Sequence, residues 1–292
     1  MYKQFYGLTQ NPFEISPDPF FFYPTQRHTE ALANLTYGVL RRKGFVVVTG
    51  EVGTGKTLLV RCLLESLSKH NVAFAYIYNP IISVPEFFIH LVDDLGLPSA
   101  AYTKYQALSQ LNNYLMKRLN KDLTTALIVD EAQLLSPELL EEIRLLTNLE
   151  TTKHKLLQIV LVGQPELDQK LDSQQLRQLK QRIGLRCALK PLNSDEIKGY
   201  IVTRLHLAGA NSRNASIFPD ETIAFIYNFS RGIPRLVNTL CENSLLLGFW
   251  HTQRQISWEI VLEVATDLGL DICPDMSFGA SSDGKNAAGS EL

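Results

Sequence analysis

The sequence has few cysteines and no long apolar run. None of its 4 cysteines in 292 residues forms a Cys-x-x-Cys pair: they are Cys62, Cys187, Cys241 and Cys273. This spacing excludes a disulfide-stapled secreted scaffold, so we expect a reducing, cytoplasmic compartment. Its apolar stretches are shorter than the roughly 18 residues that a membrane-spanning helix needs. The first residues show no basic segment followed by an apolar run, so we also expect no signal peptide.

The sequence also has little net charge. It carries 28 basic and 30 acidic residues, for a net charge of -2, and 45% of its residues are hydrophobic. A disordered chain would be less apolar and more charged. The balance gives no general signal for nucleic-acid binding, although local patches remain open. The length predicts about two domains of ~150 residues each.

Four segments differ in character. Residues 1–26 are dense in aromatics and prolines, and we expect this arm to pack on the domain that follows. Residues 27–190 alternate strand-like and helix-like patterns, residues 191–270 show helical periodicity only, and residues 271–292 are rich in Ser, Gly, Ala and Asp, which predicts a disordered tail. Five parallel strands are predicted, with helices on both faces of the sheet: Phe45–Thr49, Ala73–Tyr78, Ala126–Val129, Ile159–Val162 and Leu185–Leu189.

A glycine-rich loop follows the first predicted strand. It fits G-x-x-x-x-G-K-[ST] at every fixed position and reads Gly50-Glu51-Val52-Gly53-Thr54-Gly55-Lys56-Thr57, with Leu58 continuing into an amphipathic helix. In such a loop, backbone N–H groups and the helix N-terminus surround phosphate oxygens. We expect Lys56 to reach the β- and γ-phosphates and the Thr57 hydroxyl to ligate Mg²⁺. The alternative is a glycine-rich turn with an exposed lysine.

Two acids end the third predicted strand. Ligands bind at the carboxyl edge of a parallel sheet, so Asp130 and Glu131 should lie beside the loop. Asp130 is expected to hold Mg²⁺, and Glu131 to orient and deprotonate the attacking water. A second acid at this place favours hydrolysis of ATP over binding alone. The alternative is a solvated acidic strand end.

Gln164 follows the fourth predicted strand and should therefore lie at the same edge as Asp130. An amide at that place would contact the γ-phosphate or the attacking water. The alternative is a polar residue that caps the next helix.

The stretch from Arg177 to Lys190 contains five bases and no acid. One interpretation is that an arginine enters the active site of a neighbouring subunit and stabilises the charge of phosphoryl transfer. Arg182 is the first candidate and Arg177 the second. A solvated basic face and a nucleic-acid patch remain as alternatives.

In the helical segment, Gly232 and Pro234 predict a turn followed by a helix. Arg235 then stands at a helix start. This position fits both a contact with the nucleotide and a solvated side chain.

Taken together, these motifs resemble the AAA+ ATPases, and among them the general secretion pathway protein A (ExeA/GspA) family, including its short, stand-alone members from mannose-sensitive haemagglutinin (MSHA) pilus biogenesis. The likeness runs from Met1 to about Leu268. It is carried by stretches such as Phe5-Tyr6-Gly7-Leu8, the loop itself, Asp130-Glu131-Ala132-Gln133, Leu145 to Glu150, Gln158 to Leu167, and Gly232-Ile233-Pro234-Arg235 with Asn238.

The resemblance implies an α/β P-loop NTPase (AAA+) fold, with a five-stranded parallel sheet sandwiched by helices and a small all-helical lid. It implies Walker B acids Asp130 and Glu131, Gln164 as sensor 1, Arg182 as a trans-acting finger in a homo-oligomer, and Arg235 as sensor 2. It also places the arm's aromatics with Arg27 and His28 beside the adenine. The family's membrane span and cell-wall-binding domain are not carried over to this chain.

The preferred hypothesis is an ATP- and Mg²⁺-dependent ATPase that drives assembly of a type IV pilus or a type II secretion apparatus, cytoplasmic and peripheral at the inner membrane through its partners. The alternative is a DNA-associated ATPase of the transposition or initiator type. A third, less favoured, is a nucleotide switch without hydrolysis.

Overall fold

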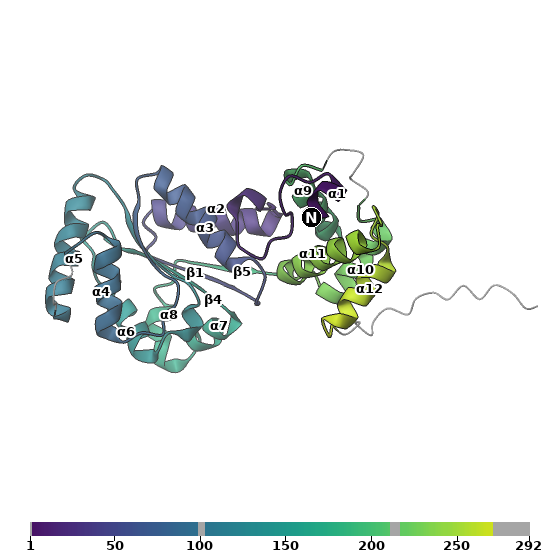
Figure 1. Cartoon of the computed structure of the whole chain (residues 1–292). Helices are drawn as coiled ribbons and strands as arrows, with labels where there is room; N and C mark the ends of the chain where they lie inside the picture. Colours follow the sequence, from purple (N-terminus) through teal and green to yellow (C-terminus); the bar gives the residue numbers. More distant parts are fainter. Residues whose placement is uncertain (1, 99–102, 211–216, 271–292) are drawn as a thin grey trace, which may run out of the picture.

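The computed structural model describes residues 2–98, 103–210 and 217–270, and the predicted tail 271–292 lies outside them. An α/β domain and a helical domain lie side by side (Figure 1).

The centre of the α/β domain is a five-stranded parallel sheet. Its strands stand in the order β2-β3-β4-β1-β5 and have the bounds β1 Phe45–Gly50, β2 Ala73–Ile77, β3 Thr125–Val129, β4 Gln158–Gly163 and β5 Leu185–Leu189. Each predicted strand is confirmed to within one residue at either end. The loop after β1 leaves the sheet at its carboxyl edge, where ligands of parallel sheets bind. It lies between the ends of β4 and β5, because these two strands flank β1.

Helices cover both faces of the sheet, which explains the unbroken apolar runs of its strands. On one face lie α2 (Gln26–Leu40) and α3 (Lys56–Lys69). On the other lie α4 (Val84–Asp94), α5 (Lys104–Leu119), α6 (Pro137–Leu146), α7 (Pro165–Leu171) and α8 (Arg177–Lys180), with the short helices η2 (Ala132–Leu134) and η3 (Gln174–Leu176) (Figure 1).

The helical domain has its own apolar core. Its helices are α9 (Ser194–Leu207), α10 (Asp220–Ser230), α11 (Pro234–Trp250) and α12 (Trp258–Asp267). The predicted start of α9 is confirmed, with Asn193 and Glu196 forming a reciprocal capping box.

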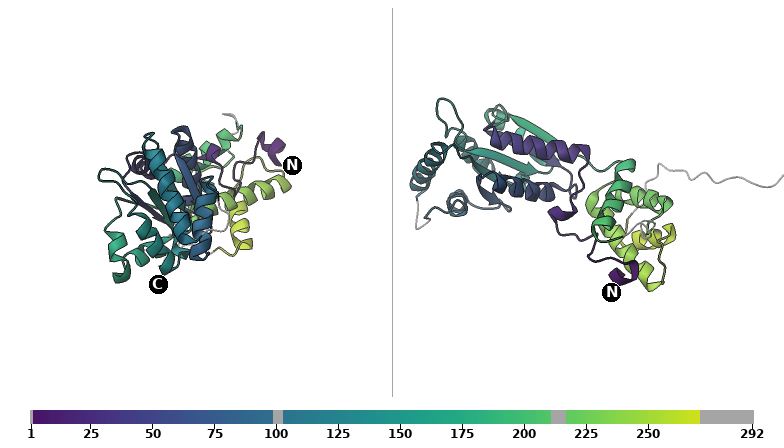
Figure 2. Two further views of the ribbon diagram at one scale, coloured as in Figure 1. Left: turned by 90° about the vertical axis from the view of Figure 1, so that its left-hand side faces the viewer. Right: turned by 90° about the horizontal axis from the view of Figure 1, so that it is seen from above.

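The packing of the N-terminal arm differs from the prediction. The arm includes α1 (Tyr2–Tyr6) and η1 (Pro19–Phe21), and its N-terminal end lies beside the helical domain (Figure 2). Its buried rings Tyr2, Tyr6, Phe13 and Phe21 belong to the core of the helical domain rather than to that of the α/β domain. The sheet's own helices already close both of its faces, whereas the small helical domain gains a larger core from these rings. Phe22 alone of the arm's aromatics packs on the α2–α3 side of the sheet.

None of the helices in the described part of the chain is both long and apolar enough to cross a bilayer.

Candidate nucleotide-binding site

The loop between β1 and α3 has the backbone of a phosphate-binding loop. Gly53 and Gly55 have φ angles of 80° and 94°, which glycine adopts without steric cost. Gly55 is the N-cap of α3, so the first N–H groups of that helix face the cavity described below. Thr54 is fully buried, and its hydroxyl donates to the carbonyl of Glu51 at 2.8 Å, which closes the loop from within.

Lys56 is buried in this loop. Its ammonium donates to the carbonyl oxygens of Gly50 at 2.8 Å and Glu51 at 3.0 Å. Burial lowers the pKa of Lys56, and the carboxylates of Glu131 and Asp130 act in the opposite direction. The lysine is thus tethered by its own loop at the place where phosphate oxygens would be bound.

Asp130 follows β3 and lies beside Thr57 as expected. The Thr57 hydroxyl donates to Asp130 Oδ2 at 3.2 Å, and the Tyr76 hydroxyl donates to the same oxygen at 3.4 Å. Burial raises the pKa of Asp130, and the N–H of Glu131 lowers it by donating to Oδ1. Adjacent hydroxyl and carboxylate oxygens are ligands that suit Mg²⁺, so this pair fits the ion that accompanies a nucleotide.

Glu131 occupies the left-handed region with φ 50°, an uncommon conformation for a residue with a side chain. Its carboxylate oxygen Oε2 accepts hydrogen bonds from Gln133 Nε2 at 2.6 Å and from Gln164 Nε2 at 3.2 Å. The acid is therefore held by two amide donors from different elements.

Gln164 lies beside Glu131 because β3 and β4 are neighbours in register. It is the N-cap residue of α7, but its side chain makes no capping bond. The alternative of a capping side chain is therefore wrong, and the amide is directed to the acid instead.

One cavity of about 350 Å³ collects residues from three parts of the chain. From the α/β domain come Val52, Gly53, Gly55, Lys56, Thr57, Leu58, Glu131 and Gln164; from the arm come residues 14–18; from the helical domain come Tyr200, Arg204, Pro234, Arg235 and Asn238. Among the predicted loop residues, Gly50, Glu51 and Thr54 support the loop rather than line the cavity. The opening lies where the two domains and the arm meet.

Arg235 reaches the loop from the first turn of α11. Its backbone N–H donates to the carbonyl of Gly53 at 3.2 Å. A Cβ on Gly53 would lie 2.8 Å from the Cβ of Arg235, so this close approach depends on glycine. The structure thus brings the predicted arginine to the loop.

A buried polar cluster of the helical domain also lines the cavity, at residues that the motifs of the sequence do not predict to be part of the site. The Arg204 guanidinium donates to the Tyr200 hydroxyl at 2.5 Å and to the Pro12 carbonyl of the arm at 2.7 Å. Tyr200 in turn donates to Asn238 Oδ1 at 2.8 Å. The only available signal was the i, i+4 spacing of Tyr200 and Arg204 on one helix face.

The expected placement of Arg27 and His28 beside a base is not observed, since neither lines the cavity. His28 is buried behind the loop, and its Nε2 lies 3.1 Å from the Thr54 carbonyl. A carbonyl only accepts, so Nε2 carries a proton toward it, and Nδ1 lies 2.7 Å from the Thr25 hydroxyl. His28 braces the loop. The arm's aromatics do not line the cavity either; Ile15 and Pro17 do.

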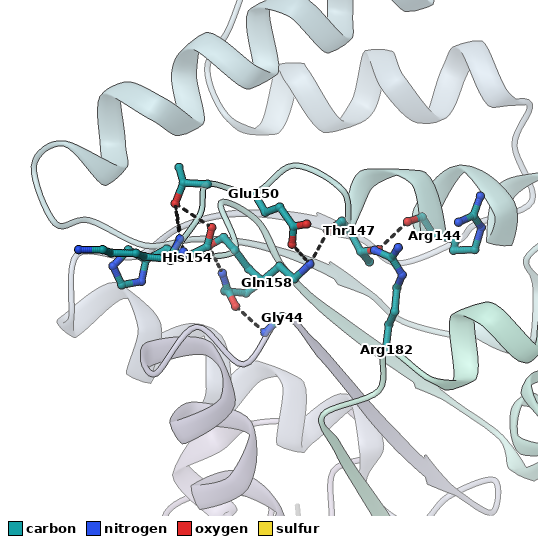
Figure 3. A network of polar contacts seen from close by, with 10 residues as sticks. Gly44, Arg144, Thr147, Glu150, His154, Gln158 and Arg182 are labelled. Carbon is teal, nitrogen blue, oxygen red and sulfur yellow. Dashed lines mark hydrogen bonds and ion pairs between the residues drawn. The ribbon is translucent and has the colours of Figure 1, made fainter.

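Arg182 lies at the opposite edge of the sheet. It precedes β5, whereas the loop follows the carboxyl end of the parallel strand β1, so the two are separated by roughly 15 Å or more. Figure 3 shows its guanidinium directed at Thr147, whose hydroxyl accepts from Arg182 Nη1 at 2.5 Å and donates to the Arg144 carbonyl at 2.6 Å. The structure does not bring Arg182 to its own subunit's cavity.

Asp168 of α7 and Asp172, the residue that caps the end of this helix, lie against the basic stretch. Lys180 pairs with Asp172 at 3.0 Å, and Arg186 Nε lies 3.1 Å from Asp168 Oδ1 and its Nη1 3.4 Å from Asp172. The stretch without acids in sequence is therefore partly neutralised in space.

Comparison with known proteins agrees with this geometry. Residues 39–171 match a family model described as an AAA domain. The chain is 44% identical to general secretion pathway protein A of Aeromonas hydrophila over 253 residues, which are 85% of this chain and 45% of that protein. This chain therefore contains an AAA domain, within a region that is similar to general secretion pathway protein A. It spans less than half the length of that relative.

Solved structures agree with the fold of this AAA protein. A Drosophila ORC structure bound to DNA superposes with a TM-score of 0.66 at 18% identity, covering 91% of this chain and 65% of that one. The RuvB branch-migration motor of Thermotoga maritima gives 0.53 at 18% identity, covering 90% and 74%. At such identities the likeness concerns the AAA fold, an α/β sheet domain followed by a helical one.

Proposed function

We propose that this AAA protein binds and hydrolyses ATP as a homo-oligomer. The observation that supports this best is the single cavity that unites the phosphate loop, Glu131, Gln164 and Arg235. A nucleotide in it would contact both domains and the arm at once, so binding and hydrolysis would change how they are held together.

Each residue has a separate task in the proposed reaction. Lys56 and the N–H groups at the start of α3 bind phosphate oxygens, and Arg235 contacts the nucleotide from the helical domain. Thr57 and Asp130 hold Mg²⁺, which supplies charge neutralisation on the phosphates when it is bound. Glu131 orients the attacking water and accepts its proton, and Gln164 contacts the γ-phosphate or that water while donating to Glu131.

The role proposed for Arg182 requires a second subunit. Because the amino edge of the sheet lies away from the phosphate loop, the guanidinium serves a neighbour in a ring or filament rather than its own nucleotide. Thr147 keeps it in a defined orientation.

The similarity to general secretion pathway protein A supports a cellular role in secretion. We propose that ATP turnover drives assembly of a secretion apparatus or of a type IV pilus, in the manner of the stand-alone pilus-biogenesis ATPase MshM. The protein would be cytoplasmic and peripheral at the inner membrane through its partners. The DNA-associated alternative has less support, because Lys180 and Arg186 are already paired with acids.

Steady-state ATP turnover tests the activity. Wild type should hydrolyse ATP in the presence of Mg²⁺, Glu131→Gln should retain ATP binding and lose turnover, and Lys56→Ala should lose ATP binding. Wild type without turnover over a wide range of protein concentration would contradict the proposal. Capture of partners from the source cell by Glu131→Gln with ATP, with Lys56→Ala as control, tests the pilus or secretion role.

A further inference from the structure

A residue outside the predicted set binds the proposed catalytic acid. Gln133 lies in η2, two residues after Glu131, and is only 9% exposed. Its Nε2 donates to Glu131 Oε2 at 2.6 Å, the shorter of the two hydrogen bonds to that carboxylate. Its own backbone carbonyl accepts from the ammonium of Lys170, which also donates to the carbonyl of Leu135 at 3.2 Å.

The orientation of the Gln133 amide is fixed by its second contact. The backbone N–H of Gln164 donates to Gln133 Oε1 at 3.0 Å. An N–H only donates, so the amide oxygen must face Gln164, and the amide NH₂ must then face Glu131. The Gln133 side chain thus joins the end of β4 to the acid that follows β3.

Gly163, the residue before Gln164, leaves room for this contact. A Cβ on Gly163 would lie 2.9 Å from Gln133 Oε1, closer than real side-chain contacts allow. The glycine that ends β4 therefore leaves space for the amide. This arrangement is more specific than the filling of an apolar gap, since a methylene chain would satisfy neither the Gln164 N–H nor the carboxylate.

We propose that Gln133 is a positioning residue for the water-activating carboxylate of Glu131. Gln133 and Gln164 both donate to Oε2, so the other oxygen, Oε1, is the one that accepts the proton of the attacking water. Glu131 stands on a strained backbone with φ 50°, and the two amides keep its carboxylate in one rotamer. This inference rests on the proposed ATP hydrolysis.

Two near-isosteric variants separate positioning from packing. Gln133→Met keeps the volume and removes the donor. Gln133→Glu still accepts from Gln164 but brings a second carboxylate against Glu131. We expect kcat to fall about 10- to 100-fold in both, while KM and the Kd for ATP stay within about twofold of wild type. Gln169→Met, at an exposed position of α7, is the matched control and should keep wild-type kcat.

The outcomes are distinguishable. Wild-type kcat in either the Met or the Glu variant overturns the positioning role, as does a loss confined to ATP affinity. Measured Kd values for ATP also report that the variant site is folded. A wild-type protein without turnover overturns the proposed function, and the role of Gln133 with it. Turnover that is normal in wild type and unaffected in the variants overturns the role of Gln133 alone.

Discussion

The backbone N–H of Arg235 donates a hydrogen bond to the carbonyl oxygen of Gly53 at 3.2 Å, and so places the first turn of α11 on the phosphate loop. This contact lies between the two domains. A nucleotide that engages the loop is therefore in reach of the helical domain without any rearrangement of secondary structure.

Gly53→Ala should weaken ATP binding about 5- to 150-fold, because the added Cβ would overlap Arg235 and Ile233 at 2.8 and 2.9 Å, and overpacking of this kind costs ~1–3 kcal/mol. The control is Gly96→Ala, which has a similar φ of 70° but nothing within 4 Å of the new Cβ. It should lose about 1–2 kcal/mol of unfolding free energy to the left-handed backbone and bind ATP normally. Equal affinities for the two variants in a fluorescent-nucleotide titration would contradict the role of this contact.

Thr57→Ala should remove most of the advantage that Mg²⁺ gives to ATP binding, since it deletes one of the two proposed ligand oxygens. The measurement is the ATP Kd with Mg²⁺ and with EDTA, and we expect the ratio to shrink about 10-fold or more. Thr57→Ser retains a hydroxyl at the position and serves as control. An unchanged ratio in Thr57→Ala would remove Thr57 from the metal site.

Arg182→Ala should retain ATP binding and lose roughly 10³-fold or more in kcat. A trans role is tested by mixing it with Lys56→Ala, since each variant supplies what the other lacks and mixed oligomers should regain turnover. Arg186→Ala, which breaks only the pairs with Asp168 and Asp172, is the control. If mixed oligomers form and turnover stays absent, the arginine does not act across the interface; if Arg177→Ala produces the larger loss, that residue is the finger.

Glu242→Gln should change the pH dependence of stability. The Tyr2 hydroxyl donates to both oxygens of Glu242, at 2.7 and 2.8 Å, and burial raises the pKa of this carboxyl above its ordinary value of 4.5. The folded state then binds more protons than the unfolded state. The contribution of Glu242 to the free energy of unfolding therefore falls as pH rises from 4.5 through the raised pKa. Glutamine avoids this loss, and the variant's melting temperature relative to wild type should be more favourable at pH 8 than at pH 5.

The control for this experiment is Glu259→Gln. A hydrogen bond from Ser257 lowers the pKa of Glu259, so its contribution is lost only as pH falls below the ordinary value. The difference in melting temperature between Glu259→Gln and wild type should stay nearly constant between pH 5 and pH 8. If the difference in melting temperature between Glu242→Gln and wild type is equally constant, the pKa of Glu242 is not raised.

Much of the site follows from contiguous residues. The phosphate loop, the strand ends at Asp130 and Gln164, and the start of α11 at Arg235 are each short patterns, and the parallel order of strands brings three of them to one edge. The structure agrees with these placements because periodicity, glycine positions and helix starts act over a few neighbouring residues.

Other features were decided only when distant segments met. The arm's rings entered the helical domain because that domain offered unfilled apolar surface, and Arg204 became part of the cavity because it bonds to Pro12, 192 residues away. Asp168 and Asp172, at the end of α7, partly neutralised a stretch that has bases and no acid in sequence. Gln133 forms hydrogen bonds with Glu131, which follows β3, and with Gln164, which follows β4. The sequence by itself determined which local units form and which of them carry phosphate chemistry; the tertiary structure decided which side chains hold that chemistry in place, since hydrogen bonds and burial depend on neighbours in space.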